Sequence, residues 1–410
     1  MTDTATAQAA PPPPQRLPTL EFIALMAMLM ASIAFSIDAM LPALPQIGAE
    51  LTPQAPNLAQ LVVTSFVLGM GLGTLFTGPL SDRFGRKPVV IGGALIYCAA
   101  ALTAFLAPTL ETLLAARVVQ GLGASAPRVV ALALVRDLYA GRGMARIMSF
   151  VMMIFSLVPA IAPSLGAVII DMSGWRSIFM AFVIFSLIGM TWLGLRQPET
   201  LAVADRRPLR LSLLWAAIKE MAAHPTVRLS IAVQTLAFGM LFATISSIQQ
   251  IFDETYGRAE SFPLWFGAIA IAAASATVLN SQIVMRVGMR AIVKAMFTVQ
   301  IGLSTLSATA IWTGIFGGLE FYLYVFWTTS VFFQAGLTIG NLNALGMEPM
   351  GHIAGMAASI MASIGTVGAV VIAVPVGLAF DGTPVPLAMA VCLCASLALW
   401  LTTMIRRDTD

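Results

Sequence analysis

Long apolar runs, more than any other feature, limit what this chain can fold into. Each run is close to the ~20 residues that an α-helix needs to cross the hydrocarbon core of a bilayer. Because that core offers no water to backbone polar groups, a chain with many such runs must cross as helices or as a closed barrel, and runs this long favour helices. The twelve expected spans are 20–42, 58–78, 88–107, 112–136, 144–170, 175–195, 226–251, 262–284, 291–313, 319–345, 352–378 and 385–405.

Composition excludes a soluble globular protein. Of the 410 residues, 59% are hydrophobic and only 10% are charged, whereas soluble domains carry about 25% charged residues. No basic patch with interleaved aromatic residues suggests a nucleic-acid partner. The three cysteines lie in apolar runs and the two histidines lie far apart, so we expect neither a disulfide framework nor a metal site.

The positions of lysine and arginine predict the orientation in the membrane. Of the 22 basic residues, 18 fall on one side if both termini are cytoplasmic, which satisfies the positive-inside rule. Residues 1–18 are polar and proline-rich, and we expect a disordered cytoplasmic tail there. The remaining divisions are a six-helix bundle over 19–195, a cytoplasmic linker over 196–225 and a second six-helix bundle over 226–410.

A charged stretch between the second and third spans carries the strongest motif. Residues 78–89 read GPLSDRFGRKPV, and residues 286–290, after the eighth span, read RVGMR as a degenerate repeat. We expect a tight loop whose glycines permit the turn and whose charges keep it in water; an ordinary positive-inside loop is the alternative. Two repeated six-helix halves are the architecture of transporters with a midplane site that opens alternately to each side.

Intramembrane charges are the candidate coupling residues. Arg117 and Arg128 lie eleven residues apart on one face of the fourth span, with Gln120 and Ala124 between them. An arginine at the centre of a bilayer costs at least ~2.5–3.5 kcal/mol, so both need partners or a wet cavity. Asp38, near the outer end of the first span, would pair with Arg117 if the two helices adjoin. The alternatives are snorkelling of Arg117, a partner for Arg128 in the cytoplasmic half, and a wetted Asp38 near the rim.

Other polar and helix-bending residues complete the candidate set. Two prolines four apart in the fifth span, Pro159 and Pro163, should bend that helix, either for gating or for packing alone. The amides of the second half each suit a ligand contact or a helix–helix contact. Those that we assign to the cavity are Gln234, Gln249, Gln334 and Asn341.

These motifs resemble those of the major facilitator superfamily. The stretch 78–89 is similar to its signature loop, RVVQGLG at 117–123 to the fourth-helix motif of drug/proton antiporters, and DAMLPALP at 38–45 to the bicyclomycin/chloramphenicol-resistance efflux group. The resemblance implies an all-α membrane protein with twelve helices in two pseudo-symmetric six-helix bundles. It implies proton coupling by Asp38 and Arg117. It also implies conformational gating; the residues that we assign to gating are Gly78, Asp82, Arg83, Gly85, Arg86, Pro159 and Pro163.

The function expected from these residues is export of small amphipathic drugs in exchange for protons across a bacterial inner membrane. No nucleotide-binding loop is present in the sequence, so the energy would come from the proton gradient without a cofactor. We expect a monomer in the bilayer whose partners are drugs and protons. A metabolite exporter or symporter of the same fold is the alternative. A membrane enzyme would need a cluster of acids or histidines, and a receptor would gain nothing from two intramembrane arginines.

Overall fold

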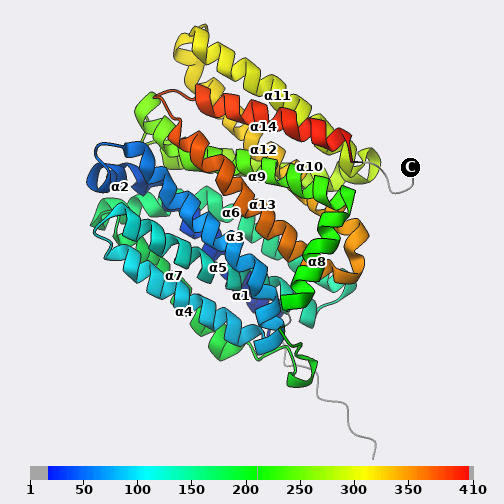
Figure 1. Cartoon of the computed structure of the whole chain (residues 1–410). Coiled ribbons are helices and arrows are strands. Elements are labelled where there is room, and N and C mark those ends of the chain that lie inside the picture. The colour runs from blue at the N-terminus through cyan, green and yellow to red at the C-terminus, as the bar shows by residue number, and fades with distance from the viewer. Residues whose placement is uncertain (1–16, 210, 406–410) are drawn as a thin grey trace, which may run out of the picture.

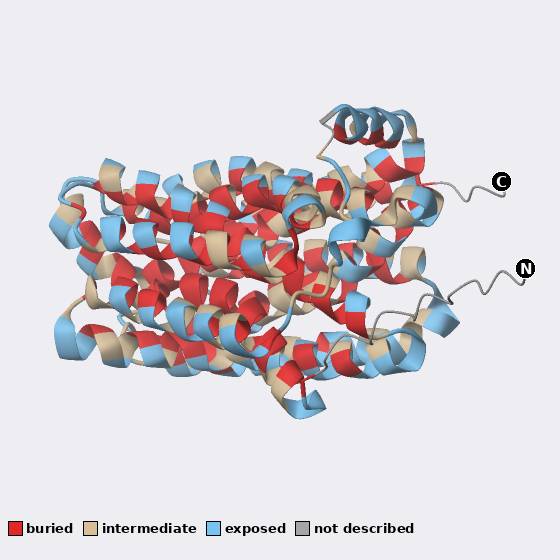
Figure 2. Cartoon of the chain, turned by 90° about the horizontal axis from the view of Figure 1, so that it is seen from below, coloured by how far each residue is buried: buried red, intermediate tan, exposed pale blue. Residues whose placement is uncertain are grey.

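The computed structural model describes residues 17–209 and 211–405 and consists mainly of long helices (Figure 1). Of the expected N-terminal tail, residues 1–16 lie outside the described residues. Both described ends of the chain emerge at the same end of the helix bundle (Figure 2). We call that end the terminal face, and the opposite end, where the α1–α3 connection lies, the distal face.

Twelve helices in the described part of the chain are long and apolar enough to cross a membrane. They form eleven continuous segments, because the segment Gly317–Leu378 contains two helices that a short 3-10 stretch separates. This confirms the twelve expected spans. The helices are α1 (Thr19–Asp38), α3 (Leu61–Phe84), α4 (Arg86–Phe105), α5 (Leu110–Leu138), α6 (Gly141–Ser173), α7 (Ser177–Arg196), α9 (Pro225–Gln250), α10 (Phe262–Val287), α11 (Met289–Thr313), α12 (Glu320–Met347), α13 (Ala354–Leu378) and α14 (Val385–Thr403).

Short elements join these helices. On the distal face they make the α1–α3 connection and extend the end of α9. On the terminal face, helix α8 lies within the expected 196–225 linker, where the sequence analysis placed no helix. The short elements are η1 (Leu41–Ala43), α2 (Leu44–Leu51), η2 (Pro56–Gln60), η3 (Val203–Asp205), α8 (Leu211–Ala223), the π turn η4 (Ile251–Thr255), η5 (Gly317–Leu319) and η6 (Glu348–Ile353).

The first six and the last six membrane helices repeat the same packing. Helix α1 packs on α6 as α9 packs on α13, and α4 packs on α7 as α11 packs on α14. The two sets meet mainly along α3 with α13 and α6 with α10, and Figure 1 shows α3 beside α13. This arrangement confirms the expected pair of pseudo-symmetric bundles and places α1 and α9 inside the molecule.

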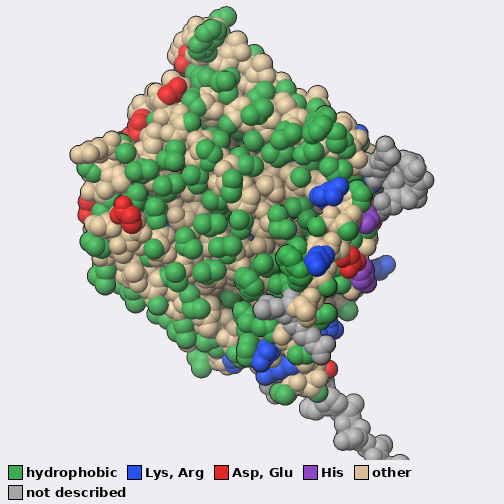
Figure 3. Space-filling view, in the orientation of Figure 1, with side chains coloured by type: hydrophobic (Ala, Val, Ile, Leu, Met, Phe, Trp, Pro, Cys, Tyr) green, Lys and Arg blue, Asp and Glu red, His purple; other side chains and the backbone are tan. Residues whose placement is uncertain are grey.

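The outer surface suits a lipid environment. Apolar side chains cover the flanks of the bundle in the space-filling view (Figure 3), and large ones such as Met172, Leu264 and Trp312 are about four-fifths exposed. By contrast, every residue of α1 from Leu25 to Asp38 except Met28 is buried. The central helices are therefore shielded by the peripheral ones, which present apolar side chains outward as a bilayer requires.

Candidate functional site

The guanidinium of Arg117 is fully buried inside the first six helices. Its Nε donates to the Val62 carbonyl at 3.0 Å, and its two amino groups donate to Gln120 Oε1 at 2.8 Å and to the Ser36 carbonyl at 3.0 Å. The ring of Phe66 lies 4.4 Å below the guanidinium carbon. Because the side chain is 0% exposed, it does not snorkel toward a headgroup, and that alternative is wrong.

Asp38 closes α1 in the same region but does not pair with Arg117. Its side chain is buried, and no described residue forms an ion pair or hydrogen bond with its carboxylate. Arg117 instead holds the carbonyl of Ser36, two residues earlier in α1. The structure therefore brings the end of α1 against α5, as the expected pairing required, but leaves the two charges without a direct contact.

Close helix packing positions Arg117. A Cβ placed on Gly121 of α5 would overlap the Phe66 carbonyl of α3, so only glycine permits this approach. The hydroxyl of Tyr97, on α4, shares a 2.5 Å hydrogen bond with Ser36 of α1. Helices α1 and α3, together with Gln120 of α5 itself, thus supply neutral acceptors and an aromatic face in place of a carboxylate.

The rest of the expected stripe on α5 is partly buried. Gln120 and Ala124 are buried beside Arg117, and Gln120 Nε2 has no hydrogen-bond partner among the described residues. Arg128 is half-buried, and the contact recorded for its guanidinium is the Met70 sulfur at 4.0 Å. The structure therefore brings Arg117, Gln120 and Ala124 together. It places Arg128 about three helical turns from Arg117, nearer the terminal face.

The amides of the second half divide into three settings. Asn341 donates to Asn280 Oδ1 at 2.8 Å and so joins α12 to α10, which is the helix–helix alternative. Gln234 and Gln334 are buried, and their Oε1 atoms accept no hydrogen bond from the described residues. Gln249 lies at the distal end of α9, away from the middle of the bundle.

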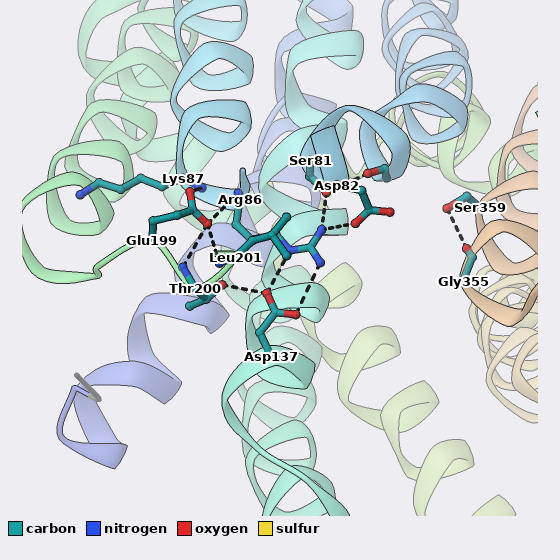
Figure 4. A network of polar contacts seen from close by, with 11 residues as sticks. Ser81, Asp82, Arg86, Lys87, Asp137, Glu199, Thr200, Leu201, Gly355 and Ser359 are labelled. Atoms are coloured by element: carbon teal, nitrogen blue, oxygen red, sulfur yellow. Dashed lines mark hydrogen bonds and ion pairs between the residues drawn. The ribbon is translucent and has the colours of Figure 1, made fainter. Parts of the chain in front are cut away.

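Arg86 lies at the centre of a polar network on the terminal face (Figure 4). It contacts Asp82 Oδ1 at 2.5 Å, Asp137 Oδ2 at 3.0 Å and the Ser81 hydroxyl at 2.8 Å. Asp137 also accepts from the Thr200 hydroxyl at 2.8 Å. The expectation that Arg86 keeps a loop in water is wrong, because its guanidinium is buried and neutralised by two acids.

The expected loop at 78–89 is in fact a single residue between two helices. Helix α3 continues through Asp82 and Arg83 to Phe84, and α4 begins at Arg86. Gly85 makes the turn at φ +102°, a backbone region that side chains resist. Gly85 alone makes the turn, so the apolar and charged residues on either side of it, which suggested a loop, are helical. Gly78, higher on α3, faces Ser359 of α13.

Glu199 is a site residue that the sequence analysis missed. Its carboxylate accepts from the backbone nitrogens of Arg86 and Lys87 at 3.0 Å each, which satisfies the free N–H groups at the start of α4 (Figure 4). Carboxylates are favoured at helix N-termini, which carry partial positive charge. The sequence signal was an acid placed directly after the sixth span, but nothing in the sequence indicated which helix it would cap.

The prolines of the fifth span lie inside one continuous helix. Both Pro159 and Pro163 belong to α6, which runs unbroken over Gly141–Ser173. Between them, the carbonyl of Ala160 lies where a Cβ on Gly267 of α10 would come within 2.7 Å. The proline segment therefore faces the other half of the molecule, where α6 and α10 meet.

Side-chain amides join the two halves at the distal face, and the sequence analysis missed them. Gln60 Nε2 donates to Gln250 Oε1 at 2.5 Å and to the Gly377 carbonyl at 3.1 Å, and Gln60 Oε1 accepts from Ser247 at 3.0 Å. Asn57 accepts from Gln250 at 2.6 Å and donates to the Phe380 carbonyl at 3.0 Å. We call Asn57, Gln60, Ser247 and Gln250 the distal clasp.

A twelve-helix bundle with repeated halves, a buried intramembrane arginine and polar contacts at each end defines a helical membrane transporter. The sequence model of the major facilitator superfamily matches residues 24–374. The chain belongs to that superfamily.

Comparison with individual proteins agrees with this assignment. A bicyclomycin resistance protein homolog of Haemophilus influenzae is 27% identical over 93% of this chain and 96% of its own. A chloramphenicol resistance protein of Pseudomonas aeruginosa is 39% identical over 42% of this chain and 41% of its own. The crystal structure of a D-xylose–proton symporter superposes with a TM-score of 0.75 at 14% identity, over 95% of this chain and 98% of that one. The resistance-protein relatives place the chain near a drug-efflux group of the superfamily, and the symporter shares its fold.

Proposed function

We propose that this protein exports small amphipathic drugs in exchange for protons, by alternating access. Its relatedness to resistance proteins supports drugs as the substrate class. The clustering of basic side chains toward the terminal face in Figure 3, with acidic ones toward the distal face, supports cytoplasmic termini. The bacterial relatives support an inner-membrane location.

The observation that carries the proposal is the pair of buried charges at Asp38 and Arg117. A carboxylate buried without a partner is costly in its charged form, and taking up a proton removes that cost. Arg117 already lies against the last turn of α1 through the Ser36 carbonyl. A small movement of α1 relative to α5 would bring the two charges together and release the proton. Proton binding would then depend on conformation, which is the requirement for coupling.

The distal clasp supports a closed outer gate in the present conformation. Its hydrogen bonds connect η2 with the ends of α9 and α13, so they must break before drug can leave on that face. Each is an uncharged contact worth about 1 kcal/mol net. Together these hydrogen bonds are strong enough to hold the distal face closed. Each one is weak enough to break when drug is released.

Drug-induced proton movement in liposomes tests the proposal. Purified protein would be reconstituted with an internal pH dye, and proton flux would be followed on addition of a panel of amphipathic drugs. We expect flux with the native protein and none with Asp38→Asn. Asp171→Asn is the matched control, because Asp171 is an exposed carboxylate in a membrane helix and no described residue forms an ion pair with it.

Two results would contradict the proposal in different ways. Full flux in Asp38→Asn would remove Asp38 from coupling. No flux with any drug, from protein that is folded by size-exclusion chromatography, would remove the drug class and favour the transport of a metabolite by the same fold.

A further inference from the structure

The distal face holds a pocket of about 390 Å³ beside the distal clasp. One wall comes from α2 and η2 in the first half, and the other from the end of α9 and η4 in the second half. The first wall is mostly apolar and includes Leu44 and Ala49, whereas the second carries Gln249, Asp253 and Glu254. The pocket therefore has one apolar wall and one acidic wall.

The polar wall offers hydrogen-bond acceptors and, among the described residues, includes no Lys or Arg side chain. Gln249 lines the pocket, is 2% exposed, and its Oε1 accepts no hydrogen bond from any described residue. No described residue forms an ion pair with Asp253 or Glu254, although Gln250 Nε2 donates a hydrogen bond to Glu254 Oε1 at 2.8 Å. A buried acceptor left without a donor costs about 1–3 kcal/mol, so a ligand that donates a hydrogen bond there is favoured.

The arginines near this face are engaged elsewhere. Arg176 contacts Glu50 at 2.5 Å, and Arg258 stacks over the ring of Phe321 at 4.4 Å. Neither lines the pocket. Neither arginine forms an ion pair with the carboxylates at the pocket, whose negative charge selects against anions and for cations.

We infer that this pocket is a binding site for an organic ammonium ion with an apolar body. The ammonium group would lie between the carboxylates of Asp253 and Glu254 and the side-chain Oε1 of Gln249. The apolar body would lie against α2. Gln60 and Gln250 line the pocket as well as forming the distal clasp, so opening the clasp would separate two of the residues that line it. An ammonium ion would bind the distal-closed conformation in preference and would stabilise it.

Fluorescence anisotropy of dansylcadaverine on the full chain in detergent tests the site. This probe has a primary ammonium group on an apolar fluorophore, and dansylamide provides the same fluorophore without the ammonium. We expect saturable binding of dansylcadaverine and at least tenfold weaker binding of dansylamide. The double variant Asp253→Asn/Glu254→Gln should raise the Kd for dansylcadaverine at least tenfold.

Two further variants separate this pocket from a general effect of surface charge. Ala49→Phe places a ring in the apolar wall from an exposed position and should also raise the Kd at least tenfold. Glu260→Gln removes an exposed carboxylate that does not line the pocket and should leave the Kd within twofold.

The inference is overturned if the native protein does not bind dansylcadaverine, if either pocket variant binds like the native protein, or if Glu260→Gln weakens binding as much as they do. It does not depend on the proposed function. Loss of drug-induced proton flux with dansylcadaverine binding intact would count against the export proposal and leave the pocket standing.

Discussion

The side-chain amide of Gln60 donates a hydrogen bond to the side-chain oxygen of Gln250, and this contact links η2 to α9 across the two halves of the molecule. The same Gln60 accepts from Ser247 and donates to the Gly377 carbonyl. One buried residue of the first half thus holds two helices of the second. The distal face is closed by side-chain amides, whereas the terminal face holds the charged Arg86 network.

Removing the Gln60 amide should open the distal face. Gln60→Ala deletes three hydrogen bonds at about 1 kcal/mol each. We therefore expect a cysteine at Ala243, buried on α9 below the clasp, to react with maleimide at least ~10-fold faster in this background. The control is Gln46→Ala, an exposed glutamine on α2. Equal labelling in both backgrounds would show that the clasp does not limit access.

Replacing Arg117 by lysine should be severe although the charge is kept. A lysine ammonium cannot reach three acceptors that a planar guanidinium contacts in different directions. Each hydrogen bond to a charged group is worth about 1.5–3 kcal/mol, so both thermal stability in detergent and drug-induced proton flux should fall when they are lost. Arg128→Lys is the matched control, since Arg128 is half-buried and contacts only a sulfur among the described residues. Similar melting temperatures for the two variants would refute this reasoning.

Asp137→Asn should slow transport more than Asp82→Asn. Arg86 faces both oxygens of Asp137, whose side chain is 20% exposed, whereas the Asp82 side chain is 44% exposed. A partly buried, charge-assisted hydrogen bond is worth about 1.5–3 kcal/mol and an exposed ion pair about 0–1 kcal/mol. Turnover in liposomes should therefore fall roughly tenfold in the first variant and by less than about fivefold in the second. Drug binding by both should be retained.

The control for this pair is Asp205→Asn, which removes an exposed acid of η3 that contributes no side chain to the Arg86 network. The ranking is contradicted if Asp82→Asn is the slower of the two, and the gating role itself is contradicted if both turn over like the native protein.

A side chain at position 85 should destabilise the terminal face. Gly85→Ala forces φ +102° on an alanine and brings its Cβ within 2.7 Å of Glu199 Oε2. Backbone strain of this kind costs about 1–3 kcal/mol, so the melting temperature in detergent should fall. Gly92→Ala, where a Cβ would meet nothing within 4 Å, is the control and should be neutral. A neutral Gly85→Ala would mean that the α3–α4 junction can rearrange freely.

The sequence determined the architecture because a bilayer leaves few choices. An apolar run of about 20 residues can satisfy its backbone only as a helix, so the runs alone located twelve helices and the α9 boundaries to within a residue. Basic residues between runs indicated an orientation, and the repeat at 286–290 indicated two halves. The sequence also marked Arg117 as exceptional. The free-energy cost of placing an arginine inside a bilayer is evident from the apolar run alone, before its partners are known.

Tertiary structure decided every pairing between those residues. Two of the three hydrogen-bond partners of Arg117 are backbone carbonyls, which every residue possesses, so no sequence pattern could identify Val62 or Ser36; the third, Gln120, lies on the stripe of α5 that the sequence indicated. Asp38 is buried in the last turn of α1 but forms no ion pair or hydrogen bond with this arginine, whose guanidinium donates to other acceptors. Glu199 caps α4 and Gln60 meets Gln250 across 190 positions of chain, and such contacts follow from how helices pack in three dimensions.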